Sequence, residues 1–123
     1  MNKRGLIGLG LAVVAALTIL VGLTVSRVMD TADREYRIVI PDGTTAKIYR
    51  GEDPEIVPQE IHLTLGEEDI LVIQNDDAGG HDVAGFYIPA GTTLRQKFTE
   101  EAVYQGECTL HPSSQIQIIV SKP

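Results

Sequence analysis

The only cysteine of this 123-residue chain and two of its three histidines are the side chains best suited to hold a metal ion. Cys108 and His111 are three positions apart in the segment CTLHP, and His81 follows a Gly-Gly pair earlier in the chain. A thiolate and an imidazole at this spacing can converge on one metal ion from a tight loop. The spacing alone is weak evidence, because a buried cysteine beside a surface histidine produces it too.

The third histidine, His62, belongs to a segment whose apolar and polar residues alternate. Ile61, Leu63 and Leu65 share one face, and His62 lies on the other with Thr64. Such alternation predicts a half-buried strand with His62 in solvent.

The elements that must position these residues are short segments rich in Val, Ile, Tyr and Thr, separated by turn residues. This pattern predicts an all-β fold, an antiparallel sandwich or barrel, with no helix beyond the N-terminal segment. The eight predicted strands are Tyr36–Ile40, Thr44–Tyr49, Glu60–Leu65, Asp69–Asn75, His81–Ile88, Thr92–Phe98, Ala102–Cys108 and Gln115–Val120. Residues 50–59 and 76–80 are predicted to be loops, the second one flexible.

The N-terminal segment predicts a membrane anchor. Gly5 to Val25 is a run of 21 residues without a charge, and a helix of that length spans the hydrocarbon core of a bilayer. Lys3 and Arg4 precede it, which places the short N-terminus in the cytoplasm and the rest of the chain on the exported, periplasmic or extracellular side of the cell membrane. A cleaved signal peptide is the alternative, and it exports the same domain.

These features divide the chain into an anchor at 1–27, a tether at 28–35 and a domain at 36–123. Beyond the N-terminal basic residues, seven basic side chains face seventeen acidic ones, a balance of −10. A surface of this charge repels nucleic acid and attracts a basic protein partner, although it also serves simply for solubility.

From Ile61 onward, over about 60 residues, the sequence resembles the cupredoxins, the copper-protein superfamily of plastocyanin, azurin and amicyanin. A strand ending in asparagine precedes the first histidine, a Pro-x-Gly turn and a strand ending in phenylalanine follow, and a tyrosine-containing strand leads into Cys-Thr-x-His-Pro. The matching residues here are Asn75, His81, Pro89, Gly91, Phe98, Tyr104, Cys108, Thr109, His111 and Pro112.

The resemblance implies a Greek-key β-sandwich of about eight strands that holds one copper ion through His81, Cys108 and His111. It also implies that the backbone N–H of Asp82 points toward the Cys108 sulfur and that the Asp82 side chain bonds the Thr109 hydroxyl, supporting the ligands.

The sequence departs from the family at the axial ligand. Amicyanin-like spacing places a methionine where this chain has Ser114. Gln115 and the backbone carbonyl of Gly80 are the two remaining candidates for a weak axial ligand. With glutamine in that place, we expect a lower reduction potential than in a methionine-ligated relative.

Three functions remain open from the sequence. The first is one-electron transfer to a cytochrome or an oxidase, with Phe86, Ile88 and Pro112 either forming an apolar docking patch beside His111 or serving as ordinary core packing. The second is copper binding or delivery without redox turnover, and the third is a β-sandwich that only binds proteins. An enzyme is not expected, because no nucleophile–base pair stands out and a binuclear copper centre needs a second cysteine in the same loop.

Overall fold

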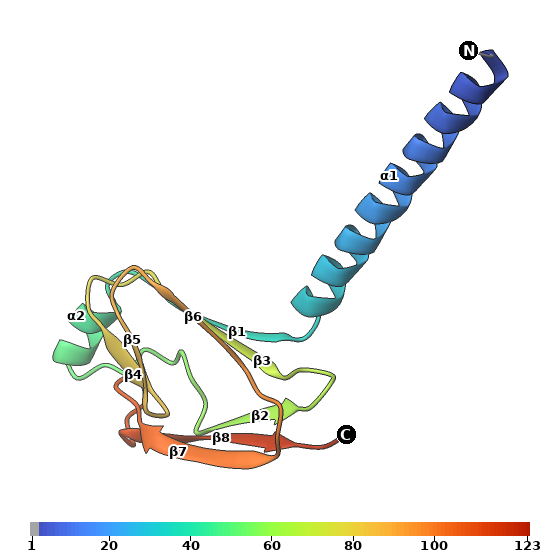
Figure 1. Ribbon diagram of the computed structural model, residues 1–123. Coiled ribbons are helices and arrows are strands. Elements are labelled where there is room, and N and C mark those ends of the chain that lie inside the picture. Colours follow the sequence, from blue (N-terminus) through green and yellow to red (C-terminus); the bar gives the residue numbers. More distant parts are fainter. Residues whose placement is uncertain (1–2) are drawn as a thin grey trace. The chain divides into compact units, whose positions relative to one another are not determined.

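The computed structural model describes the backbone from Lys3 to Pro123; within the N-terminal helix it describes side chains at residues 10–23 and 31–32. The chain forms two compact units, Met1–Asp33 and Arg34–Pro123. The first contains helix α1, Lys3–Ala32, and the second contains all the strands (Figure 1).

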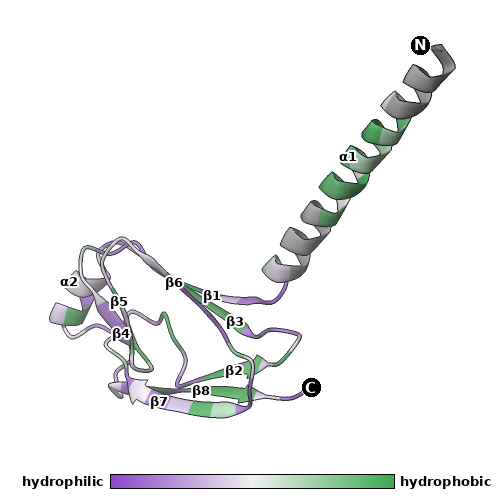
Figure 2. Ribbon diagram, viewed as in Figure 1, coloured by the Kyte–Doolittle hydropathy of each residue, from purple (hydrophilic) through white to green (hydrophobic). Residues whose placement is uncertain are grey.

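Helix α1 is coloured mostly as hydrophobic along the stretch where its side chains are described (Figure 2), and the large apolar side chains there are exposed. Each is more than half exposed: Leu11, Val13, Val14, Leu17, Ile19, Leu20, Val21 and Leu23. The ends of the predicted anchor, residues 5–9 and 24–25, lie outside the residues whose side chains are described. Among the described residues, no helix is both long and apolar enough to cross a membrane. Helix α1 continues to Ala32 and β1 begins at Glu35, so regular structure takes up most of the predicted tether.

The second unit is built mainly from two three-stranded sheets (Figure 1). One sheet has the order β1 (Glu35–Ile40), β3 (Ile70–Asn75), β6 (Thr93–Lys97). The other has the order β2 (Glu60–Thr64), β8 (Gln115–Ser121), β7 (Ala102–Glu107). A separate two-stranded hairpin consists of β4 (His81–Val83) and β5 (Phe86–Ile88).

A single hydrophobic core joins the two sheets. It takes inward-facing side chains from β1 and β3 on one side and from β2 and β8 on the other, as expected for two stacked sheets. Its members from these strands are Ile38, Ile40, Ile61, Leu63, Leu71, Ile73, Ile116, Ile118 and Val120. The mainly β, two-layered architecture predicted from the sequence is therefore confirmed.

The prediction of purely antiparallel pairing was wrong. β1 pairs with β3 in parallel, and β2 pairs with β8 in parallel. The chain passes from β1 to the other sheet for β2 and then returns for β3, so consecutive strands of one sheet can run in the same direction. The remaining pairs, β3 with β6, β7 with β8 and β4 with β5, are antiparallel.

The segment Thr44–Tyr49, predicted to be a strand, is the short helix α2. Its β-branched residues favour a strand, but two tertiary hydrogen bonds hold its first turn. The carboxylate of Asp77 accepts from the backbone N–H groups of Gly43 (3.0 Å) and Thr45 (2.8 Å). A side chain more than thirty positions away thus caps the helix, and no local pattern could reveal it.

The segment His81–Ile88, predicted to be one strand, is the β4–β5 hairpin. Ala84 and Gly85 form its two-residue turn with φ angles of 50° and 84°. Two consecutive positive φ values are typical of the type I′ turn, which matches the twist of the flanking strands. The total of eight strands agrees with the prediction only because this division compensates for the strand lost at α2.

A buried ion pair closes the end of the domain where β1 begins. Arg34 bonds both oxygens of Asp69, with Nε to Oδ1 at 3.1 Å and Nη2 to Oδ2 at 2.5 Å. Asp69 is 3% exposed and also accepts from the Gly66 N–H at 2.9 Å. Burial raises the pKa of Asp69, but the Arg34 and Gly66 hydrogen bonds outweigh it, so the pKa lies below its ordinary value.

We expect Asp69→Asn to lower the free energy of unfolding at neutral pH by about 1.5–3 kcal/mol, because Arg34 loses a charged partner. A folded-state pKa below the unfolded value of about 3.9 means that the ion's contribution is complete above that pH and is lost as the pH falls through the folded value. Urea denaturation of both proteins between about pH 5 and pH 2 should therefore show the difference shrinking with acid. Glu67→Gln, at an exposed position of the turn that precedes Asp69, is the control; a difference that stays constant with pH would contradict the assignment.

Candidate metal centre

The three predicted ligands lie on two segments of the domain. His81 begins β4 and is 3% exposed, and Cys108 directly follows β7 and is 2% exposed. His111 lies in the loop between β7 and β8 and is half-buried. The sequence predicted Cys108 as the last residue of a strand, and it lies one residue beyond β7; His81 begins a strand as predicted, but a much shorter one.

The loop that carries Cys108 and His111 is closed by its own backbone. The Cys108 N–H donates to the Ser114 carbonyl at 2.9 Å, and the Ser114 N–H donates to the His111 carbonyl at 2.9 Å. Ser114 adopts a φ of 59°, a left-handed conformation uncommon outside glycine, to make this turn. The loop is thus a tight turn of the kind that brings a thiol and an imidazole together.

Thr109 attaches this loop to the strand that carries His81. Its N–H donates to the Asp82 carbonyl at 2.9 Å, and its hydroxyl accepts from the Asp82 N–H at 3.2 Å. The same hydroxyl lies 3.2 Å from Nδ1 of His81. Asp82 and Thr109 therefore link the two ligand-bearing segments, although through the Asp82 backbone; the N–H expected to face the Cys108 sulfur bonds Thr109 instead.

The Cys108 sulfur is buried among backbone donors. Burial raises the pKa of the thiol, and the backbone N–H groups of Leu110, His111 and Ala84 each act in the opposite direction by hydrogen bonding to it; the net pKa is raised. Without a metal ion the group is therefore a protonated thiol at neutral pH. With a cation bound, the same three N–H groups would stabilise the thiolate.

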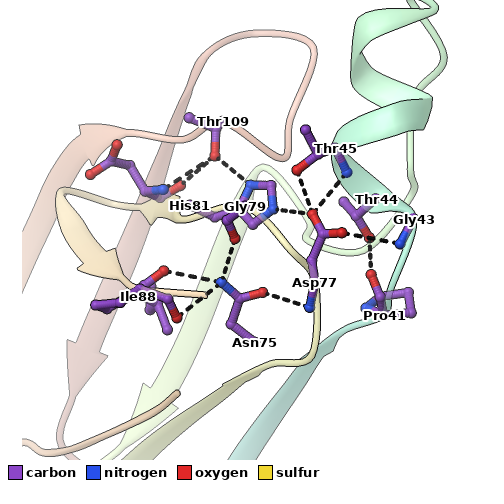
Figure 3. A network of polar contacts seen from close by, with 12 residues as sticks. Pro41, Gly43, Thr44, Thr45, Asn75, Asp77, Gly79, His81, Ile88 and Thr109 are labelled. Atoms are coloured by element: carbon purple, nitrogen blue, oxygen red, sulfur yellow. Dashed lines mark hydrogen bonds and ion pairs between the residues drawn. The ribbon is translucent and has the colours of Figure 1, made fainter. Parts of the chain in front are cut away.

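His81 is oriented by a buried carboxylate, as Figure 3 shows. Its Nε2 lies 2.8 Å from Oδ2 of Asp77, which is itself 3% exposed. Asp77 also accepts from the Thr45 hydroxyl at 2.5 Å and from the α2 backbone N–H groups described above. Burial raises the pKa of Asp77, but these donors, His81 included, hold it well below its ordinary range. Because an ionised carboxylate can only accept, Nε2 of His81 donates to Asp77, and Nδ1, which now faces the Thr109 hydroxyl at 3.2 Å, is the ring nitrogen that remains for a metal ion.

Asn75 holds the loop 76–80 in place, so this loop, predicted to be flexible, is pinned at both ends. Its Nδ2 donates to the carbonyls of Gly79 (2.8 Å), Ile88 (3.1 Å) and Pro89 (3.2 Å). Its Oδ1 accepts from the Asp77 N–H at 3.0 Å. Sequence reasoning missed the roles of Asp77 and of Thr45 on α2. The four-residue spacing of Asp77 and His81 was the only local signal, and a loop rich in aspartate and glycine conceals it.

Gln115 and Gly80, the two candidates for an axial ligand, both lie at exposed positions. Gln115 is exposed, and its Oε1 accepts from Nε2 of Gln105 on the neighbouring strand at 3.3 Å. Gly80 is exposed, and the Tyr87 hydroxyl occupies the space that a side chain at position 80 would need. Neither position is shown contacting Cys108, and the choice between them stays a prediction.

The predicted apolar docking patch is mostly interior. Ile88 is fully buried in the core, and Phe86 is half-buried with its ring 6.3 Å from that of Tyr104. Only Pro112 is exposed as expected. Phe86 and Ile88 are two positions apart on β5 and therefore share its inward face, whereas Tyr87 between them is exposed.

Two cavities of about 300 Å³ each flank the Cys108–His111 loop. One is lined by Cys108 and His111 together with Glu52 and Asp53, and the other by Cys108, Ser113 and Gln115. In the part of the chain that the structure describes, no group of three or more His, Cys, Asp and Glu side chains is close enough to hold a metal ion. Nδ1 of His111 instead accepts the Ser113 N–H at 3.1 Å and lies 2.7 Å from the Ser113 hydroxyl.

The donor set nevertheless fits copper. One thiol and two imidazoles are the ligands that both Cu(I) and Cu(II) accept, and the Thr109 contacts hold the two segments together. His111 is half-buried beside a cavity, so its ring has room to turn.

We expect Asp77→Asn to destabilise the domain by about 1–3 kcal/mol, because an amide NH₂ would face buried N–H donors that the carboxylate now satisfies. Chemical denaturation measures the loss, and the NMR signals of the His81 ring should show its tautomer become mixed. Asp76→Asn is the matched control, since the exposed Asp76 side chain bonds only Gln74 and should change stability by less than about 0.5 kcal/mol. Equal losses in the two variants would refute the role given to Asp77.

Neither a protein-family model nor a curated protein matches the chain. Among solved structures, the chain is similar to a purple cupredoxin from Nitrosopumilus maritimus, with a TM-score of 0.43 and 25% identity over 69% of this chain and 98% of that one. It is also similar to a variant of amicyanin in the Cu(I) state, with a TM-score of 0.44 and 19% identity over 72% of this chain and 84% of that one. At such TM-scores these likenesses do not support a functional assignment. The function is therefore argued from the residues of the site.

Proposed function

We propose that the domain is a cupredoxin that holds one copper ion through His81, Cys108 and His111 and acts as a one-electron carrier. The observation that carries this proposal is the attachment of the Cys108 loop to β4 by Thr109, whose hydroxyl reaches the His81 ring. That attachment ties the loop with Cys108 and His111 to the strand with His81, and the resemblance of the Cys-Thr-x-His-Pro segment to the family supports the same ligand set.

Copper, when bound, supplies a one-electron couple; the chain supplies the fixed surroundings. Asp77 keeps a proton on Nε2 of His81, so Nδ1, which lies beside the Thr109 hydroxyl, would be the nitrogen that binds the ion. The backbone N–H groups around the Cys108 sulfur stabilise negative charge there, and the near-complete burial of Cys108 and His81 excludes water. A site whose groups are held by backbone and buried side chains changes little between two oxidation states.

His111 is the most solvent-accessible of the three proposed ligands, and it is therefore the proposed point of electron exit. The acidic excess of the domain supports a basic redox partner, such as a cytochrome or an oxidase. Copper delivery without redox turnover is the second candidate, and the absence of a methionine at position 114 favours it. A reversible potential with fast electron self-exchange would distinguish the carrier from the delivery protein.

The N-terminal segment is proposed to anchor the domain to the cell membrane on its exported side. The uncharged run from Gly5 to Val25 and the exposed apolar side chains of α1 support this. We expect the full chain, expressed in a bacterium, to stay in the membrane fraction after an alkaline carbonate wash. Mass spectrometry of the isolated protein distinguishes the anchor from a signal peptide, because cleavage near Ser26 would remove the segment.

The test of the metal site is a titration of the detergent-solubilised full chain with Cu(II). We expect an intense thiolate-to-copper band in the visible spectrum that saturates at one equivalent and is lost in Cys108→Ser. His62→Ala is the matched control, because His62 is exposed and bonds only Glu60, and it should leave the band unchanged. Oxidation of the thiol with no visible band would exclude both electron transfer and copper delivery. A β-sandwich that only binds proteins would then be the remaining function.

A further inference from the structure

The tip of the β4–β5 hairpin rests against strand β7, just before Cys108. The Gly85 N–H donates to the Glu107 carbonyl at 3.0 Å, which ties the turn to β7 beyond the pairs within either sheet. Ala84, the other turn residue, is only 6% exposed. A hairpin turn usually projects into solvent, so its burial against a neighbouring strand needs a specific cause.

Gly106 is that cause. A Cβ atom at this position would lie 2.5 Å from the carbonyl carbon of Ala84 and 2.6 Å from both the Ala84 oxygen and the Gly85 nitrogen. The obstacles are backbone atoms and cannot rotate away. Any residue other than glycine at position 106 must therefore push the hairpin tip off β7.

The seating of this tip reaches both proposed ligand segments. The turn is bonded to Glu107, the residue directly before Cys108, and the hairpin that contains this turn begins at His81. Cys108 follows Gly106 by two residues and lies directly after the end of β7. The depth of the contact at Gly106 thus determines how closely the hairpin with His81 approaches the sulfur.

We propose that Gly106 is a positioning residue, which seats the β4–β5 turn against β7 so that the turn shields Cys108 and the His81 segment lies beside it. The part that concerns the metal ion rests on the proposed function, whereas the covering of the thiol does not. The hairpin tip can pack this closely against β7 because Gly106 has no side chain, and not because a side chain of β7 contacts it.

The test compares Gly106→Ala with Gly66→Ala in the metal-free, detergent-solubilised full chain. Gly66 also lies in a turn, and a Cβ there meets nothing within 4 Å, although its φ of 82° is strained for alanine. The control therefore accounts for a general loss of stability. We expect the Cys108 thiol to react with a disulfide reagent at least about tenfold faster in Gly106→Ala and within about twofold of the wild-type rate in Gly66→Ala.

Copper loading supplies the second measurement. In Gly106→Ala the thiolate-to-copper band should weaken or shift, and in Gly66→Ala it should keep its position and intensity. Equal thiol reactivity in the two variants overturns the proposal. Faster thiol reaction in Gly106→Ala together with no copper band in the wild type supports the packing role of Gly106 and rejects the copper function, so the two failures are distinguishable.

A third measurement needs no variant at position 106, in case Gly106→Ala does not fold. In the wild-type chain the amide of Ala84 should exchange with deuterium slowly, and Cys108→Ser should shift its NMR signal much more than that of Gly91, which lies in the turn after β5. Exchange of the Ala84 amide as fast as that of an open loop would overturn the proposal.

Discussion

The buried carboxylate of Asp77 fixes much of the structure around the proposed metal site. An ionised group can remain in the interior only when hydrogen-bond donors surround it, and here they come from the first turn of α2, from a threonine hydroxyl and from a histidine ring. Each donor belongs to a different part of the chain. Satisfying one charge therefore fixes the start of α2, the course of the loop 76–80 and the orientation of His81 together.

The rest of the site depends on that fixed histidine. Thr109 contacts the opposite side of the His81 ring and the backbone of the next residue, and so brings in the loop with Cys108 and His111. Because Gly106 has no side chain, the tip of the β4–β5 hairpin can pack against β7 near Cys108. Two stacked sheets supply a rigid core, and the site is assembled on the loops and the hairpin that the core leaves at its edge.

The sequence predicted those parts of the fold in which local pattern and tertiary environment agree. β2 and β8 were predictable because their apolar residues alternate and one face of each lies in the core, and β3 because it is an apolar run bounded by turn residues. Thr44–Tyr49 was misassigned because its helical state depends on Asp77, which is far away in sequence. The parallel pairing of β1 with β3 likewise depends on how the chain crosses between sheets.

The residues of the proposed site likewise fall into those that the sequence identified and those that it did not. Residue type and spacing identified His81, Cys108 and His111, since thiol and imidazole are recognisable wherever they occur. Asp77, Ala84 and Gly106 escaped notice because their contribution lies in a hydrogen bond across the fold, a backbone N–H or an absent side chain. None of these leaves a mark on composition or periodicity. Ile88 fills the core, so of its two expected roles, docking residue and core residue, the second is the one that the structure has.

The Arg34–Asp69 pair gives the domain a mechanical property. Arg34 is the first residue of the compact domain, and its backbone carbonyl also accepts the Ile70 N–H at 3.1 Å. Tension transmitted along the chain from the preceding segment would reach this double attachment before it reached strand β1. A pull at the N-terminus would thus be carried by the Arg34–Asp69 pair at the edge of the sheet, and His81, Cys108 and His111, the proposed ligands, would be shielded from that motion.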